Sequence, residues 1–255
     1  MKLLKQFTCT FIVLTWLSNG GCAVFKDLEY ACQPARPAGM GGAYVAICDG
    51  ADALFWNPAG IGQLGKMAFT FLHAQLLSNI ELEEEISAKN AACVFYIPKL
   101  RSTIGLSWAS LNLVDIYSES LLGFNLARGA QRGDRRIYYG VALRWFTHWC
   151  NTDLLVNPDD PTFERGATKS NLGLDAGVLV VFKGGRTRVG LVLQNVNQPD
   201  LGYGQPDPIP LLVRTGLALS FKLGPNKKIQ LMPSVELSYR EGETNLHAGM
   251  AVSYT

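Results

Sequence analysis

Apolar and polar residues alternate with a period of two along most of the chain after residue 66. The clearest case is the last segment, NLHAGMAVSYT, in which every second residue from Leu246 to Tyr254 is apolar. The segment before it, IQLMPSVELSYR, alternates in the same way. Successive side chains of a strand point to opposite faces, so this pattern predicts strands that are apolar on one face only.

Further segments along the chain show the same alternation. They are MAFTFLHAQ, AACVFYIP, TIGLSWAS, LLGFNLAR, YYGVALRWF, NLGLDAGVLVVF, TRVGLVLQ and LLVRTGLALSFK. Together with the two segments above, they predict about ten strands, many of them near the length that a tilted strand needs to cross a bilayer.

The second face of these strands is rich in glycine and poor in charge. Alternation alone does not separate a membrane barrel from a soluble barrel or sandwich, because each has one apolar face. A solvated second face would be dense in Lys, Glu and Thr, whereas small residues with a few charges suit a crowded polar lumen. The residues concerned are Gly105, Gly123, Gly140, Gly173, Gly177, Gly190, Gly216 and Gly249, with Arg144, Asp175, Arg188, Arg214 and Glu236.

The links between the predicted strands alternate in length. The short links are PKLRS, GAQRGDR, FKGGR and LGPNKK, and the longer ones are LSNIELEEEISAK, SLNLVDIYSE, CNTDLLVNPDDPTFERGATKS and NQPDLGYGQPDPIP. Outer-membrane barrels have short periplasmic turns and longer external loops. Residues 67–255 are therefore predicted to form an all-β, transmembrane antiparallel β-barrel, with a periplasmic β-sandwich as the alternative.

Residues 1–23 predict a signal peptide for export. Lys2 and Lys5 precede the apolar run FTCTFIVLTWL, and small residues at Gly21 and Ala23 suit cleavage after residue 23. The run is shorter than the roughly 20 apolar residues of a spanning helix. Lipid attachment at Cys22 is the alternative.

Residues 24–66, between the signal and the first strand, predict a hatch packed inside the barrel. The segment is rich in Gly and Ala, too apolar for a free loop and too short for a domain of its own. Pro58 is expected to end the helical patch DALFW, because proline lacks a donor and biases Asn57 away from helical angles.

Residues 36–64, RPAGMGGAYVAICDGADALFWNPAGIGQL, resemble the N-terminal signature of the PorV/PorQ-type outer-membrane proteins, relatives of the FadL fatty-acid transporters. The later segments NLGLDAGVLV, VGLVLQNV, DPIPLLVRTGLAL and NLHAGMAVSY also fit that family. Family barrels extend several strands beyond the last of these. The resemblance therefore leaves open whether this is a smaller barrel or an incomplete chain.

The resemblance implies a protein of the bacterial outer membrane, surrounded by lipid, whose hatch lies in the lumen. FadL relatives pass hydrophobic compounds through such barrels, whereas PorV-type members are membrane partners of exported proteins in a secretion pathway. The alternative is a structural or surface-interaction barrel without transport activity. The hatch motif that the resemblance singles out comprises Gly39, Gly41, Gly42, Asn57, Pro58, Ala59 and Gly60.

The inward charges Arg144, Asp175, Arg188, Arg214 and Glu236 predict a lumenal polar network. Such a network could bind a ligand headgroup, but buried charges more often pair with each other or with the hatch. With a formal net charge of +2 and 17% charged residues, the chain lacks the basic face of a nucleic-acid binder.

Catalytic and metal-binding motifs are lacking in the sequence. It contains no GxSxG or HExxH, and the AGMGGAYVA stretch lacks the further features of a phosphate loop. His148, near Asp153, is expected to be an interfacial histidine at a strand end rather than a hydrolase residue. No CxxC pair indicates zinc. Cys32 and Cys48 could form a disulfide or remain buried thiols, and the chain is expected to be a non-enzyme without cofactors.

Overall fold

In the computed structural model the described residues are 28, 32–77, 86–113, 116–151, 167–203, 205–223 and 228–254. They form one antiparallel sheet with a few short helical turns. The strands are β1 (Ala68–Leu77), β2 (Ile86–Ile97), β3 (Ser102–Leu113), β4 (Tyr117–Arg132), β5 (Arg135–Cys150), β6 (Thr168–Phe182), β7 (Thr187–Gln194), β8 (Leu212–Leu219), β9 (Phe221–Leu223), β10 (Ile229–Arg240) and β11 (Glu243–Tyr254).

The helical turns lie in two places. Those before the sheet are the α-helix α2 (Ala35–Gly39) and the 3-10 helices η1 (Ala51–Phe55) and η2 (Pro58–Gln63), and those between strands are η3 (Pro98–Leu100) and η6 (Lys183–Gly185). Within the described ranges no helix is both long and apolar enough to cross a bilayer. The predicted signal peptide, with its alternative lipid attachment at Cys22, lies outside the described residues.

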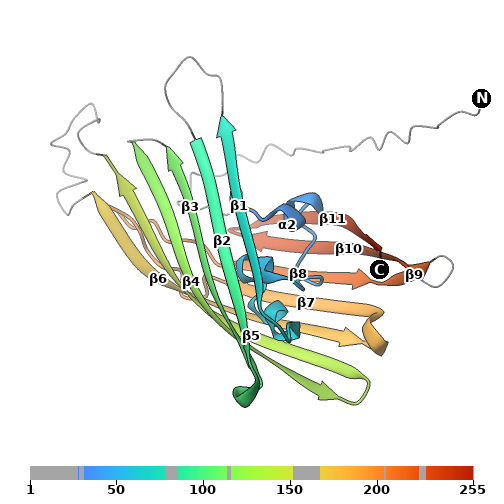
Figure 1. Ribbon diagram of the computed structural model, residues 1–255. Helices are drawn as coiled ribbons and strands as arrows, with labels where there is room; N and C mark the ends of the chain where they lie inside the picture. Colours follow the sequence, from blue (N-terminus) through green and yellow to red (C-terminus); the bar gives the residue numbers. More distant parts are fainter. Residues whose placement is uncertain are drawn as a thin grey trace, which may run out of the picture.

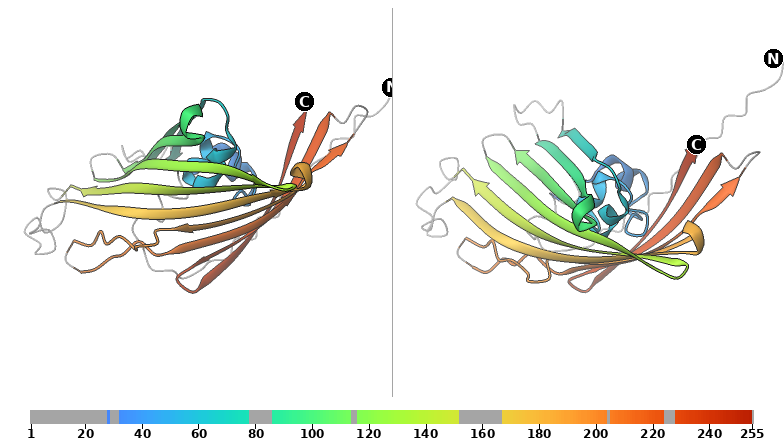
Figure 2. Two further views of the ribbon diagram at one scale, coloured as in Figure 1. Left: turned by 90° about the horizontal axis from the view of Figure 1, so that it is seen from below. Right: turned by 60° about the horizontal axis from the view of Figure 1, so that its bottom comes forward.

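Each strand pairs with its neighbour along the chain, in the order β1 to β8, then β10 and β11, with β9 pairing to β10. The sheet curves around the segment before β1, which lies in its concavity (Figures 1 and 2). The predicted all-β antiparallel fold is confirmed. In the described residues β1 pairs with β2 alone and β11 with β10 alone, so the wall is open between its first and last strands.

The two faces of the sheet follow the predicted alternation. On β5, Val141 and Trp145 are each 55% exposed on the convex face, whereas Ala142 between them is 3% exposed on the concave face. The convex face of the other strands likewise carries Leu, Val, Phe and Tyr. An apolar surface of this extent is unfavourable in water, and it matches the lipid-facing band of an outer-membrane barrel.

The predicted strand LLVRTGLALSFK is divided into β8 and β9 at Ser220. The β10 pairing is interrupted at the same level, between the pairs Leu231–Phe221 and Ser234–Ala218. Pro233 lies in this interval, and proline has no N–H to donate to a neighbouring strand. On the β7 side, the Ser220 N–H donates to the Arg186 carbonyl oxygen at 2.7 Å.

One predicted long link is largely strand. SLNLVDIYSE was expected as a connection, but β3 continues to Leu113 and β4 begins at Tyr117. The prediction was wrong because the segment keeps the strand alternation, with Leu111 opposite Glu119. At the same end of the sheet, Glu241 and Gly242 join β10 to β11 in a tight turn, both with positive φ (50° and 86°).

The largest buried apolar cluster lies between the concave face and the segment before β1. It contains Tyr44, Val45, Ile47, Leu54 and Ile61 from that segment, packed against Ala92, Val94, Val192, Ala218 and Met232 from the sheet. The core of the protein therefore fills the interior of the curved wall, and the strands present their other face to the outside.

Candidate functional site

The hatch, predicted over residues 24–66, is described at residue 28 and from residue 32 onward. The predicted helical patch DALFW lies mostly in the 3-10 helix η1, which ends at Phe55 with Trp56 as its C-cap. Asn57 follows with an extended backbone (φ −143°), and Pro58 opens the second turn, η2. Proline is favoured at the first position of a helix because its missing N–H would be unpaired there. Pro58 therefore begins η2, whereas η1 already ends at Phe55.

Asn57 joins three parts of the site. Its Oδ1 accepts a hydrogen bond from the Ala59 N–H at 3.0 Å, which caps η2. Its Nδ2 donates to the carbonyl oxygens of Val45 at 3.2 Å and of Val178, on β6, at 3.4 Å. A single fully buried amide thus fixes the hatch to itself and to the wall.

Inward glycines of the wall form the seat of the hatch. A side chain at these positions would collide with the hatch, so glycine permits the close approach of two backbones. An added Cβ would meet Leu54 at Gly105, Pro58 at Gly140, Asn57 at Gly177, Val45 at Gly190 and Gly216, and Met40 at Gly249. Gly123 and Gly173 instead face wall side chains, Ser107 and Phe146.

Glu236 on β10 is the main acidic anchor of the hatch. Its Oε2 accepts hydrogen bonds from the backbone N–H of Tyr44 (2.9 Å) and Val45 (2.7 Å) and from the Trp56 Nε1 (3.2 Å). Its Oε1 lies 3.6 Å from the Arg214 Nε, and the Arg214 guanidinium lies 4.1 Å from the centroid of the Trp56 ring. Glu236 is 1% exposed, and a charge buried so deeply requires such partners.

Arg188 on β7 is the corresponding basic anchor. Its Nε donates to the Ala46 carbonyl oxygen at 2.9 Å, and its Nη2 donates to the Ile47 carbonyl oxygen at 2.8 Å and the Gln63 Oε1 at 2.6 Å. Gln63 in turn donates to the Cys48 carbonyl oxygen at 2.6 Å. These bonds satisfy carbonyl groups of a segment that has no sheet or long helix to pair them.

The predicted polar network is divided in two. Arg188, Arg214 and Glu236 contact the hatch, whereas Arg144 on β5 pairs with Asp175 on β6, with 2.5 Å between Nε and Oδ2. Asp175 also accepts the Asn195 N–H at 2.9 Å. The second pair belongs to the wall, and its arginine, Arg144, lines a separate cavity beside the hatch.

The glycines of the predicted hatch motif have different roles. Gly41 and Gly42 follow α2 with positive φ (59° and 84°), and an added Cβ on Gly42 would meet the His247 ring. The Gly41 carbonyl oxygen lies 3.1 Å from the His247 Nδ1 on β11. Gly39 has open space where a Cβ would stand, so nothing in the structure explains glycine there.

The end of the motif is packed tightly within the hatch. Ala59 is fully buried, and its backbone N lies 2.7 Å from the position of a Cβ on Gly140. A Cβ on Gly60 would lie 2.6 Å from the Cys48 Cβ and 2.9 Å from that of Ala53. The Asn-Pro-Ala-Gly tetrad therefore brings η2 close both to the wall and to the preceding turn.

Sequence reasoning missed several polar anchors. Asn90, Thr103 and Gln194 donate to the hatch carbonyl oxygens of Cys32 (2.6 Å), Leu64 (3.3 Å) and Phe55 (3.4 Å), respectively. With His247 they bind the hatch from β2, β3, β7 and β11. Thr103, Gln194 and His247 are polar residues at inward positions of predicted strands, which is the signal that would have identified them, whereas Asn90 directly precedes a predicted strand.

A charged cluster lies within the hatch itself. The Arg36 Nη1 is 2.8 Å from Asp49 Oδ1 and 3.9 Å from Asp52 Oδ2, and the Tyr44 hydroxyl donates to Asp52 Oδ2 at 2.9 Å. Burial raises the pKa of Asp52 above its ordinary value, and Arg36 and Tyr44 oppose that rise only in part. Burial likewise raises the pKa of Tyr44.

Cys32 and Cys48 are free thiols, so the disulfide that the sequence left open is not formed. The Cys32 Sγ donates to the Ser110 carbonyl oxygen at 3.2 Å, and burial raises the pKa of this thiol to about 11. Among the described residues no group of three or more His, Cys, Asp or Glu side chains could hold a metal ion.

His148 is not an interfacial residue, contrary to the sequence prediction. It is buried on the inner face of β5, between the rings of Tyr117 and Tyr203, whose centroids lie 4.8 and 4.9 Å away. The prediction was wrong because it considered only the position near the end of a strand and not the inward direction of the side chain. Asp153 lies outside the described residues.

A curved β-wall with an apolar outer face and a hatch against its inner face defines a bacterial outer-membrane protein. Residues 51–255 match the family described as the type IX secretion system membrane protein PorP/SprF, and the chain belongs to that family. The predicted location and the link to protein export are confirmed. The PorV/PorQ and FadL relationships are not confirmed by this match.

Among solved structures, the chain is similar to a porin refined at 1.8 Å resolution, with 16% identity and a TM-score of 0.39. The match covers 75% of this chain and 58% of the porin chain, so this chain spans less than two thirds of its length. A comparison with curated proteins found no match.

Proposed function

We propose that this outer-membrane protein is a docking partner for exported proteins in type IX secretion, in the manner of the PorV type, and that its hatch is a fixed closure of the lumen. The role requires no catalysis and no cofactor. The observation that carries the proposal is the attachment of the hatch to strands around the whole wall, from β2 to β11.

Removing the hatch from the wall would require a large free energy. It would separate Glu236 from two backbone N–H groups and an indole N–H, and Arg188 from two carbonyl groups. Stripping the partners from one buried charge costs on the order of 3–5 kcal/mol. Two such anchors, together with the glycine seat, favour a hatch that stays in place during function.

The space beside the hatch also favours docking. Toward the β10–β11 turn, the cavities next to Trp56 have volumes of about 50 Å³ and 30 Å³. Sites for drug-sized or lipid-like compounds are usually about 300–1,000 Å³. Between these cavities and the opposite end of the sheet lies the buried hatch core from Tyr44 to Ile61.

One observation favours a second candidate function, in which the barrel is a conduit for hydrophobic compounds. A hollow of about 780 Å³ lies at the other end, beside η6 and β9, and includes Leu219, Phe221 and Gln230 around the interrupted pairing near Pro233. If the wall opened laterally at this interrupted pairing, a hydrophobic compound could pass from the lumen to the lipid. The conduit requires the hatch to move, and docking does not.

A disulfide lock separates the two candidates. A Cβ at position 216 would lie 2.5 Å from the Val45 Cγ1, so the pair Val45→Cys and Gly216→Cys is placed to bond. The variant is made with Cys32, Cys48, Cys93 and Cys150 replaced by serine. Cells producing it are compared under oxidising and reducing conditions, and type IX substrates reaching the surface and medium are measured by mass spectrometry.

Docking predicts that the oxidised lock exports as well as the reduced one, while a detergent-purified locked protein still captures exported substrates. The single variants Val45→Cys and Gly216→Cys, treated with the same oxidant, control for the substitutions themselves. Loss of export on oxidation that returns on reduction would contradict a fixed hatch. It would support the conduit if uptake of a hydrophobic compound into vesicles changed in parallel.

A further inference from the structure

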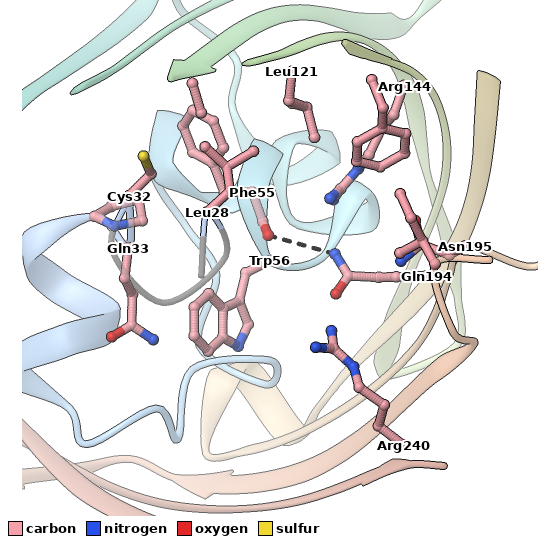
Figure 3. Close-up of a pocket in the computed structure, with 14 residues that line it drawn as sticks. Leu28, Cys32, Gln33, Phe55, Trp56, Leu121, Arg144, Gln194, Asn195 and Arg240 are labelled. Atoms are coloured by element: carbon pink, nitrogen blue, oxygen red, sulfur yellow. Dashed lines mark hydrogen bonds between the residues drawn. The ribbon is translucent and has the colours of Figure 1, made fainter. Parts of the chain in front are cut away.

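The cavity next to Arg144 has the features of a binding site rather than a packing defect. Its apolar lining includes Leu28, Phe55 and Trp56 from the hatch side and Leu121, Phe146 and Ile209 from the wall side. Its polar groups are those of Gln33, Arg144, Gln194, Asn195 and Arg240. None of the described residues that line it is acidic. In Figure 3 the guanidinium groups of Arg144 and Arg240 point into the space beside Trp56.

Arg144 carries an unmet donor toward this space. Its Nε is paired with Asp175, but no described residue accepts a hydrogen bond from its Nη2, although the residue is only 9% exposed. A buried guanidinium N–H without an acceptor costs free energy that a bound acceptor would recover. An oxygen with negative charge is the strongest acceptor for such a group.

The rest of the lining limits what can bind. The volume of about 50 Å³ holds roughly three to five water-sized groups, since one such group needs about 10–15 Å³. Two or three of these would be a carboxylate beside the guanidinium groups. The remainder would lie against the Phe55 and Phe146 rings, where water is poorly hydrogen-bonded and a small alkyl group is favoured.

We propose that this cavity binds a carboxylate that carries a small apolar group, with Arg144 as its ion-pair partner. The carboxylate could belong to a short free acid or to the last residue of a peptide chain, because both present the same chemistry to the cavity. The inference goes beyond docking and does not depend on it. If the cavity bound no carboxylate, the result expected from the disulfide lock would be unchanged.

The test is isothermal titration calorimetry of the full protein in detergent, with propionate and propionamide as probes. Propionate is expected to bind, and propionamide to bind at least about tenfold more weakly, because it loses the charge-assisted hydrogen bond. N-acetylalanine and N-acetylalaninamide form a second pair. Tighter binding of N-acetylalanine than of propionate would identify a peptide terminus as the source, and the reverse order a free acid.

Two variants test the location. Ala109→Leu adds bulk to the lining and keeps every charge, so it should weaken propionate binding at least about tenfold. Ala176→Leu adds the same bulk on the outer face of β6 and should leave binding unchanged. Removing the pair together, Arg144→Met with Asp175→Leu, avoids an orphaned charge and should abolish binding. Equal binding by all these proteins, or no heat with either acid, would overturn the proposal.

Discussion

The outer and inner faces of the same strands obey different rules. On β5 the outer side chains Val141 and Trp145 are exposed among the described residues. The inner positions Gly140 and Ala142 are covered. The outer face needs only to be apolar, because lipid has no fixed shape. The inner face must match one particular hatch atom by atom, and its glycines and charges are specific to their positions. Substitutions on the inner face should therefore be sensitive to shape, and those on the outer face to polarity.

The largest effect is expected at the inner charge Glu236. Glu236→Leu removes the acceptor of three hatch donors and leaves Arg214 buried without its carboxylate, so stability should fall by about 3–5 kcal/mol. Urea unfolding of the protein in lipid vesicles, followed by heat-modifiable gel migration, measures the change. Glu236→Gln keeps the shape and should cost less. Equal stability of the wild type and the leucine variant would mean that the anchor contributes nothing.

A charge on the outer face should have the next largest effect. Val141 lies near the middle of β5, paired with Leu126 and Ala176. Val141→Arg should destabilise the protein in vesicles by about 2–4 kcal/mol, as expected for a basic residue near the bilayer midplane. Val141→Leu, which changes shape but not polarity, should be nearly neutral. A neutral arginine variant would contradict the lipid-facing assignment.

A small increase in side-chain volume should affect stability differently on the two faces of the sheet, and two adjacent residues of β6 test this. Gly177→Val places side-chain atoms against Asn57 and should cost about 1–3 kcal/mol, because the hatch must shift. Ala176→Val makes a comparable addition on the outer face, where it should change stability by less than about 0.5 kcal/mol. The same unfolding assay compares them. Indistinguishable values would show that the glycine seat is not required.

The smallest effect concerns the pH dependence of the hatch. Because burial raises the folded-state pKa of Asp52 above the ordinary value of 3.8, the folded protein binds this proton more tightly than the unfolded chain does. The contribution of Asp52 to the free energy of unfolding therefore increases as the pH falls through the folded-state pKa. At neutral pH, burial disfavours the ionised carboxylate. Asp52→Asn should be more stable than the wild type at pH 7, with a difference that shrinks toward about pH 4. A difference that grows on acidification would have the wrong sign.

The faces of the strands could be predicted from sequence, but the contacts across the interior could not. Alternation alone placed Gly177 and Glu236 on the inner side, because a strand has a fixed period of two. Which hatch atom each residue meets depends on how a segment with little regular structure folds, and on contacts between residues as distant as Val45 and Glu236. The division of the β8–β9 strand coincides with Pro233 in a neighbouring strand, a relationship that inspection of single segments does not include.

The most direct test of the account is a spin-label scan along β5. Single cysteines at Val141, Leu143, Trp145, Ala142 and Phe146, in a background without other cysteines, are labelled and reconstituted in vesicles. Collision rates with oxygen, which concentrates in lipid, and with a water-soluble nickel chelate are then measured. If the convex face contacts lipid, labels at 141, 143 and 145 should have high oxygen and low nickel accessibility, and labels at 142 and 146 should have low accessibility to both. Nickel-accessible labels at the three odd positions, or lipid exposure at 142 and 146, would contradict it.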